Sequence, residues 1–236
     1  MGTSEQVRSG RRLRAEPDHF GIVLLMLVAA YVLSVLSSSS LARVVVGALY
    51  VGALVYAVRA SDPGPRLRRV LWVVVVGGAV AIVAAALLLH HADASGVIDC
   101  VLVLVLLSAL ICMLDRILTS RDVTARLIAG ALSAYLMVGM IFASIFGVLA
   151  WVQGDFFASG QDPDAASLQY FSFVTLTTLG YGDLTAVSNA GRGLAALEAL
   201  IGQVFLATLI ARLVGSFRRP TAPETRPVPP EESDRT

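Results

Sequence analysis

The sequence contains no lysine, and all 18 of its basic residues are arginine. Charge of either sign is scarce: 15% of the 236 residues are charged, and the net charge is +1. Soluble domains average about 25% charged residues. With a net charge this close to zero, nothing in the composition argues for nucleic-acid binding, and we expect no nucleic-acid partner.

Cysteine is also scarce. The two cysteines, Cys100 and Cys112, lie in one apolar run, where twelve residues of helix would separate them by about 18 Å. A disulfide needs Cα atoms within about 7 Å, so these residues are expected to be unpaired. The sequence shows no convincing metal-ligand cluster and no nucleophile–base set in its apolar runs. We therefore expect neither an enzyme nor a bound cofactor.

Hydrophobic residues, by contrast, are abundant, at 56% of the chain with a mean hydropathy of +0.77. Long apolar runs of this kind predict an all-α membrane protein in the lipid bilayer. We expect six transmembrane helices, with a short re-entrant helix and loop between the fifth and the sixth. The six runs are Phe20–Leu36, Leu41–Val58, Val70–Leu89, Cys100–Leu114, Leu127–Val152 and Gly193–Leu213.

Arginine clusters alternate with the predicted spans. They precede the first run, separate the second from the third and the fourth from the fifth, and follow the sixth. The positive-inside rule then predicts a multi-pass protein of the plasma membrane with both termini cytoplasmic. A cleaved signal peptide over Arg11–Ala42 is the alternative interpretation of the first run, but the run is long for that purpose.

Composition also predicts four segments. Residues 1–18 are expected to form a cytoplasmic disordered tail, and residues 19–120 a four-helix transmembrane domain. Residues 121–215 would form a pore domain of helix, pore helix, filter and helix. Residues 216–236 are rich in Pro, Glu and Arg and are expected to form a second disordered cytoplasmic tail.

The stretch "TLTTLGYGD", residues 175–183, interrupts the apolar pattern between the fifth and sixth runs. Irregular backbone survives in a membrane only where it is buried in protein or lines a wet cavity. Gly180 and Gly182 permit positive φ, so successive carbonyl groups can be turned the same way. Four copies around an axis would supply rings of oxygens for a bare cation, and because one chain holds one copy, we expect a homotetramer.

The string Thr178–Gly182, "TLGYG" within "TTLGYGD", resembles the selectivity filter of the pore-loop potassium channels. The resemblance extends from Leu127 to Gly215 and is to bacterial members of the voltage-gated-like, six-transmembrane superfamily. It implies that K⁺, the permeant ion, is bound by the carbonyl groups of Thr178, Leu179, Gly180 and Tyr181. It also places the Thr178 hydroxyl at the cytoplasmic end and Gly182 at the outer mouth.

The same resemblance assigns residues that support the filter. A pore helix near Leu168–Thr177 is expected to aim its carbonyl end at the central cavity, with Thr177 in a structural role. Asp183 would raise the local cation concentration. The chain departs from the family at Phe171, where many relatives have tryptophan, and at Val174, where some have a glutamate that pairs with the aspartate.

Two residues of the sixth run have alternative interpretations. Gly202 aligns with the glycine at which the inner helix of the family bends, so it is a candidate gating hinge, although a glycine for close helix contact is equally consistent. Glu198 lies inside the membrane, where a carboxyl group is a functional-site hypothesis by default. It could face the pore, but we expect it behind the filter, bonded to a pore-helix threonine such as Thr175.

The fourth run lacks the arginines of a voltage sensor. Arg116, Arg121 and Arg126 are five residues apart and lie at its cytoplasmic boundary, so they are interpreted as anchors. The sequence thus predicts passive K⁺ conduction that is not strongly voltage-gated. Two alternatives are a non-selective cation channel of the same fold, which the intact "GYG" disfavours, and a non-conducting membrane scaffold.

Overall fold

A computed structural model of the chain describes residues 19–36, 40–61, 65–88, 91–119 and 124–217. These residues are mainly helical and contain no strand, so the predicted all-α class is confirmed for the described part. The predicted tail 1–18 lies outside the described residues, as does 218–236. The helices are α1 (His19–Leu36), α2 (Ser40–Ser61), α3 (Pro65–Leu88), α4 (His91–Thr119), α5 (Ala125–Gln153), α6 (Ala165–Leu176) and α7 (Asn189–Phe217).

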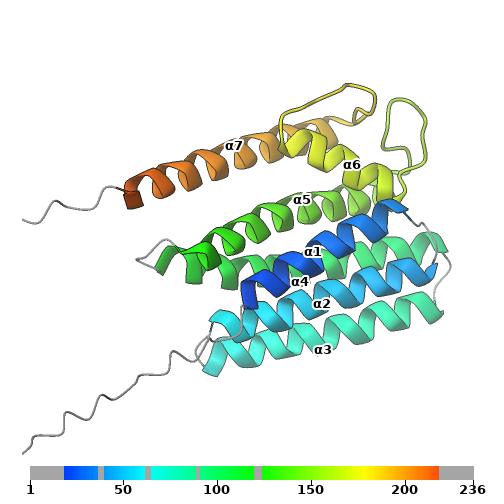
Figure 1. Cartoon of the computed structure of the whole chain (residues 1–236). Helices are drawn as coiled ribbons and strands as arrows, with labels where there is room; N and C mark the ends of the chain where they lie inside the picture. Colours follow the sequence, from blue (N-terminus) through cyan, green and yellow to red (C-terminus); the bar gives the residue numbers. More distant parts are fainter. Residues whose placement is uncertain (1–18, 37–39, 62–64, 89–90, 120–123, 218–236) are drawn as a thin grey trace, which may run out of the picture.

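The helix α5 lies between two groups of helices (Figure 1). On one side it contacts α1 and α4, which together with α2 and α3 form a four-helix bundle. On its other side it contacts α6 and α7. The first four helices are therefore attached directly to the last three, within one chain.

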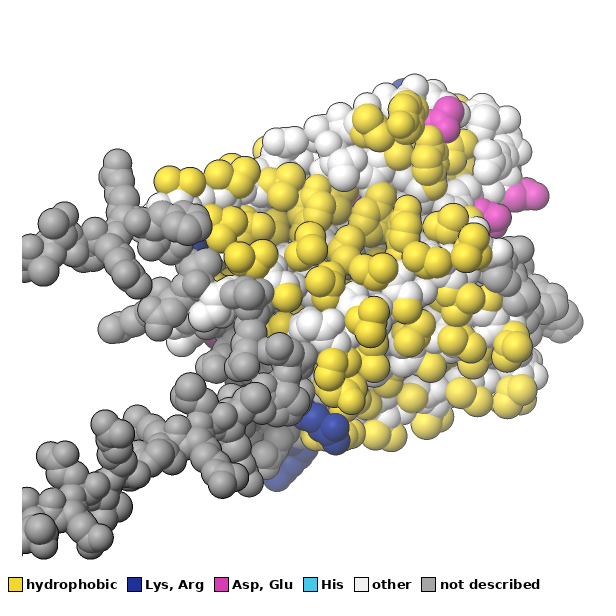
Figure 2. All heavy atoms as spheres, in the orientation of Figure 1, with side chains coloured by type: hydrophobic (Ala, Val, Ile, Leu, Met, Phe, Trp, Pro, Cys, Tyr) yellow, Lys and Arg dark blue, Asp and Glu magenta, His cyan; other side chains and the backbone are white. Residues whose placement is uncertain are grey.

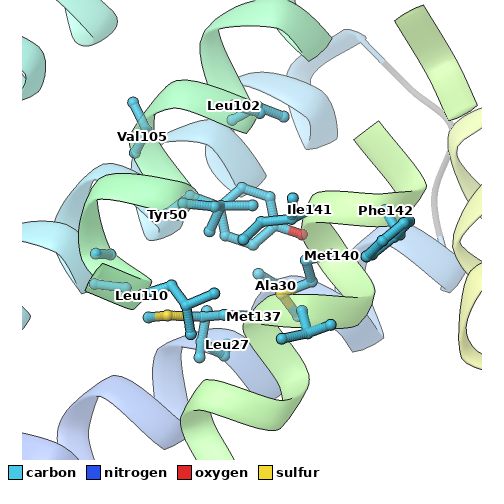
Figure 3. Close-up of a cluster of buried hydrophobic side chains, with 14 of the residues drawn as sticks. Leu27, Ala30, Tyr50, Leu102, Val105, Leu110, Met137, Met140, Ile141 and Phe142 are labelled. Atoms are coloured by element: carbon cyan, nitrogen blue, oxygen red, sulfur yellow. The ribbon is translucent and has the colours of Figure 1, made fainter. Parts of the chain in front are cut away.

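Hydrophobic side chains hold this junction together. Figure 3 shows Met137 and Met140 of α5 facing Leu27 of α1, Tyr50 of α2 and Leu110 of α4. All five are buried. Burying a side chain of this size stabilises the fold by roughly 1.5–3 kcal/mol. The α1–α4 bundle thus forms a collar against α5.

The outer surface of the helices is also apolar. Figure 2 shows hydrophobic side chains across the middle of the visible face, with arginine at the end where α3 begins and acidic side chains near α6. Among the described residues, three helical segments are long and apolar enough to cross a membrane: Asp93–Thr119, Leu127–Gln153 and Asn189–Gly215. Phe20–Leu36, Val44–Arg59 and Arg69–Ala85 are shorter apolar segments, so the other three expected spans stay a prediction.

One helix begins earlier than its apolar run. The fourth run starts at Cys100, but α4 begins nine residues before it, at His91. Asp93 lies in the first turn of α4, where a negative charge is favourable beside the positive end of the helix dipole.

Candidate functional site

The short helix α6 begins with a side-chain cap. The Asp164 carboxylate accepts a hydrogen bond from the Ser167 amide at 2.8 Å, which satisfies a helix N–H that has no partner within the helix. The Ser167 hydroxyl donates to the Asp164 carbonyl at 3.0 Å. Six residues of α6 are buried. The cap and this burial fix the helix, and with it the start of the loop that follows.

The loop after α6 is tied to the helix by its amide groups. The amides of Leu179 and Gly180 both donate to the Val174 carbonyl, at 2.9 and 3.2 Å, and the Thr178 amide donates to Thr175 at 2.9 Å. In the described part of the chain, no hydrogen bond is accepted by a carbonyl of residues 178–182. The donors of the loop therefore face α6, and its carbonyl oxygens are free to bind something else.

The sign of φ alternates along this loop. Thr178, Gly180 and Gly182 have φ of 58°, 55° and 79°, whereas Leu179 and Tyr181 do not have positive φ. Alternating left- and right-handed residues gather successive N–H groups on one side of a chain, and the carbonyl groups then point to the other. Thr178 is the one non-glycine residue with positive φ in the described part of the chain. Backbone strain of this kind concentrates at functional sites.

At the inner end of the loop, α7 contacts Thr178. The Gln203 amide donates to the Thr178 hydroxyl at 3.1 Å. Gly202, beside it, is buried against α6, because a Cβ placed there would lie 2.5 Å from the Leu176 carbonyl oxygen. Helix α7 runs unbroken through this point, so close contact alone accounts for the glycine. The hinge assignment of Gly202 stays a prediction.

Glu198 lies behind the loop, with none of its surface exposed. The Ser172 hydroxyl of α6 lies within hydrogen-bonding distance of the Glu198 carboxyl and of the Gly139 carbonyl of α5, the latter at 2.6 Å. The partner is thus Ser172 and not Thr175, which lies three residues further along α6. Through these contacts, Ser172 and Glu198 join three helices behind the loop.

At the outer end, the Tyr170 hydroxyl donates to the Asp183 carboxylate at 2.8 Å. This hydrogen bond to an anion raises the pKa of Tyr170. Val174 stands where some relatives have a glutamate, so that partner for Asp183 is lost. Tyr170, four residues earlier on α6, supplies the bond instead, which the family resemblance does not predict.

The remaining predicted support residues do not all contact the loop. The Thr177 hydroxyl donates to the Phe173 carbonyl at 2.7 Å and completes the last turn of α6. Phe171 packs against Phe146, Phe156 and Phe157, with ring centroids 5.1–5.7 Å away. It therefore stabilises the contact of α6 with α5 and with the segment after it. The Tyr181 side chain is 68% exposed.

The segment that contains α6 and the loop is similar in sequence to known ion channels. Residues 130–219 match the model of the family described as "Ion channel". The chain is 32% identical over 109 residues to the inward rectifier potassium channel Kirbac3.1 of Paramagnetospirillum magnetotacticum, an alignment that covers 46% of this chain and 34% of that protein. It is 30% identical over 84 residues to the potassium voltage-gated channel protein shk-1 of Caenorhabditis elegans, covering 34% and 16%.

The chain therefore spans about a third or less of the length of these two relatives. No solved structure is significantly similar to it. The ion channel match indicates transport and not catalysis, and together with the apolar helices it supports a membrane protein. From α5 to the end of α7, the chain is similar to ion channels, and its likeness to two potassium channels supports a relation to the pore-loop potassium channel family.

Proposed function

We propose that this chain is one subunit of a homotetrameric, K⁺-selective channel whose filter is Thr178–Gly182. The observation that carries the proposal is the backbone of this loop, with alternating φ and five carbonyl groups that accept no hydrogen bond in the described structure. Rings of such carbonyls can replace the water around a cation. The two relatives are potassium channels, which favours K⁺ as that cation.

The proposal of four subunits is supported by the parts of α7 and of the loop 177–183 that a single chain leaves exposed. Only 11% of the most apolar part of α7 is buried, and Gln203 is exposed halfway along this helix. The loop 177–183 is exposed as well. Polar backbone and an amide side chain are not stable against lipid, so other copies and a water-filled pore must cover them. A closed ring of four copies satisfies this requirement.

The membrane topology is part of the same proposal. Helices α1–α5 and α7 would be six spans, with α6 and the filter re-entering from the outer face of the plasma membrane. Both termini would be cytoplasmic, since α1 begins and α7 ends at the same end of the bundle (Figure 1). The acidic loop residues Asp155, Asp162 and Asp164 would then lie outside, where they attract cations.

Purified full-length protein in liposomes tests this function. Potassium uptake driven by a K⁺ gradient should exceed sodium uptake under a matched gradient, and native mass measurement should give four chains. A monomer or dimer in the membrane, or equal uptake of the two ions, would contradict the proposal. Equal uptake by a tetramer would favour the non-selective cation channel, and no uptake by a tetramer would favour the scaffold.

A further inference from the structure

A cavity of ≈ 450 Å³ lies between the collar and α6, away from the filter. Its walls come from α1, α2, α4, α5 and α6, at the end of the bundle where α6 begins. Cavities that bind small organic ligands measure about 300–1,000 Å³, whereas one water molecule occupies about 30 Å³. The cavity is therefore large enough for an organic molecule.

Buried apolar side chains from four helices line this cavity. They are Val46 of α2, Ile98 and Leu102 of α4, Met140 and Ala143 of α5, and Leu168 of α6. Figure 3 shows the ring of Tyr50, another lining residue, between α4 and α5. A buried water molecule needs about two to four polar partners, so water beside these apolar side chains would be poorly bound. A hydrocarbon body suits this part of the wall better.

Gln169 of α6 contributes an unpaired acceptor to the same wall. Its side chain is only 3% exposed, and its Nε2 donates to the Tyr50 hydroxyl at 3.4 Å. Its Oε1 has no hydrogen-bond partner among the described residues. A buried acceptor that is left without a donor is destabilising. The cavity is therefore matched to a ligand that brings a hydrogen-bond donor as well as an apolar body.

A neutral hydroxyl group is the donor that fits this acceptor. The Gln169 amide carries no charge, so it needs a donor but no counter-ion. Moving an ion in among apolar side chains costs far more than moving a hydroxyl group, and a hydrogen bond to Oε1 offsets the cost for the hydroxyl. Asp99 of α4 also lines the cavity, but it already takes part in another interaction, so the ligand needs no charge to pair with it.

We propose that this cavity binds a neutral amphipathic alcohol, whose O–H donates to the Gln169 Oε1 and whose apolar body packs against Leu102 and Met140. A monoacylglycerol from the bilayer and a soluble alcohol both carry this combination of groups, and the experiment below separates these two sources.

Binding would also act on the loop, through α6. Leu168 and Gln169 line the cavity. Later turns of the same helix carry Ser172, which contacts Glu198, and Val174, whose carbonyl accepts two loop amides. An effect of the alcohol on conduction therefore rests on the proposed function. Binding itself does not, and it is measured separately.

Tryptophan fluorescence measures this binding. The chain has two tryptophans, of which Trp151 lines the cavity and Trp72 lies on α3, so the full chain with Trp72→Phe reports Trp151 alone. We expect 2-(4-bromophenyl)ethanol to quench it in a saturable way, through its bromine atom. The reference compound 1-bromo-4-ethylbenzene lacks only the hydroxyl group. With both probes expressed by their concentration in the bilayer, the hydrocarbon should bind about fivefold more weakly, because it makes no hydrogen bond to Gln169.

Gln169→Met replaces the amide by an apolar group of similar length. It should weaken binding of the alcohol about fivefold and leave binding of the hydrocarbon unchanged. Gln161→Met is the matched control, because Gln161 is exposed and does not line the cavity, and it should alter neither affinity. Tyr50→Phe keeps the site testable if Gln169→Met does not assemble. It removes the hydroxyl that holds the Gln169 amide, so it should also weaken alcohol binding.

Competition identifies the source of the alcohol. Displacement of the brominated probe by 1-oleoylglycerol in the liposome bilayer would identify a lipid, whereas displacement by 2-phenylethanol alone would identify a soluble alcohol. The proposal is overturned if the alcohol and the hydrocarbon bind equally to the Trp72→Phe protein, or if neither cavity variant alters alcohol affinity by more than about twofold. Such a result with K⁺ flux intact leaves the channel assignment standing.

Discussion

Gly180 has a φ of 55°, and a Cβ added to it would meet no atom within 4 Å in the single chain. The cost of Gly180→Ala in this chain is therefore conformational, because the left-handed region costs other L-residues roughly 1–2 kcal/mol. In a tetramer that penalty recurs in each subunit. We expect the variant to assemble but to lose selective K⁺ flux in liposomes.

Gly193→Ala is the control for this substitution. Gly193 also has nothing within 4 Å of its added Cβ, but its φ is not positive. It should retain K⁺ uptake. If Gly180→Ala conducts K⁺ as selectively as Gly193→Ala does, the loop backbone does not form the filter.

Glu198 and Gln203 differ in exposure, although both lie on α7. Glu198 is fully buried against Ser172, whereas Gln203 is exposed and contacts the Thr178 hydroxyl. In a background with Cys100→Ser and Cys112→Ala, a cationic thiol reagent applied from the cytoplasmic side should modify Gln203→Cys and block flux. Glu198→Cys should stay unmodified. Rapid modification at 198 would mean that this side chain faces the pore.

Helices α6 and α7 are in close contact at Gly202. Alanine in a helix interior is favoured over glycine by about 1 kcal/mol, so Gly202→Ala would stabilise α7 if the glycine served only as a hinge. The Leu176 carbonyl leaves no room for the methyl group. We therefore expect a lower Tm of the assembled protein, measured by thermal unfolding in detergent.

Gly215→Ala supplies the comparison within the same helix, because an added Cβ there meets nothing within 4 Å. It should leave the Tm unchanged or raise it. If Gly202→Ala has a Tm as high as that of Gly215→Ala, close helix contact does not explain why residue 202 is glycine.

Hydropathy predicts where most of the helices lie, but it does not predict the residues at which they begin and end. Apolar runs indicated six of the seven helices, and the family resemblance indicated α6. Hydropathy could not show that the polar stretch from His91 to Asp99 is helical. The filter string was recognisable from sequence because its glycines and threonines have a specific order. The choice of Ser172 and not Thr175 as the Glu198 partner depends on the rotation of α6 against α7, which no local pattern encodes.

For the whole molecule, the attachment of the collar to α5 determines what the first four helices can do. Steep voltage gating requires several charges per subunit to cross the field, each worth about 2.3 kcal/mol per 100 mV. The sequence of α4 between Asp93 and Leu114 holds acidic residues and no arginine. Its contact with α5 is also closely fitted, because added Cβ atoms at Gly96 and Gly147 would overlap Trp151 and Asp99.

We therefore expect a shallow conductance–voltage curve in symmetric K⁺ between about −100 and +100 mV, a range that puts roughly 4–5 kcal/mol on one full charge. The measurement is planar-bilayer recording of the purified protein. A steep sigmoid that disappears on neutralising Arg116 and Arg121 would show that α4 is a voltage sensor. Neutralising Arg59, an exposed arginine on α2, is the control for the effect of removing an arginine outside α4.

If the carbonyl groups of Thr178–Gly182 select K⁺ over Na⁺, the selectivity is measured by the reversal potential under bi-ionic conditions. With K⁺ on one side of a planar bilayer and an equal concentration of Na⁺ on the other, each tenfold preference shifts the reversal potential by about 59 mV. We expect a shift beyond about 59 mV in the direction set by K⁺, corresponding to more than tenfold selectivity. A reversal potential at zero would contradict it.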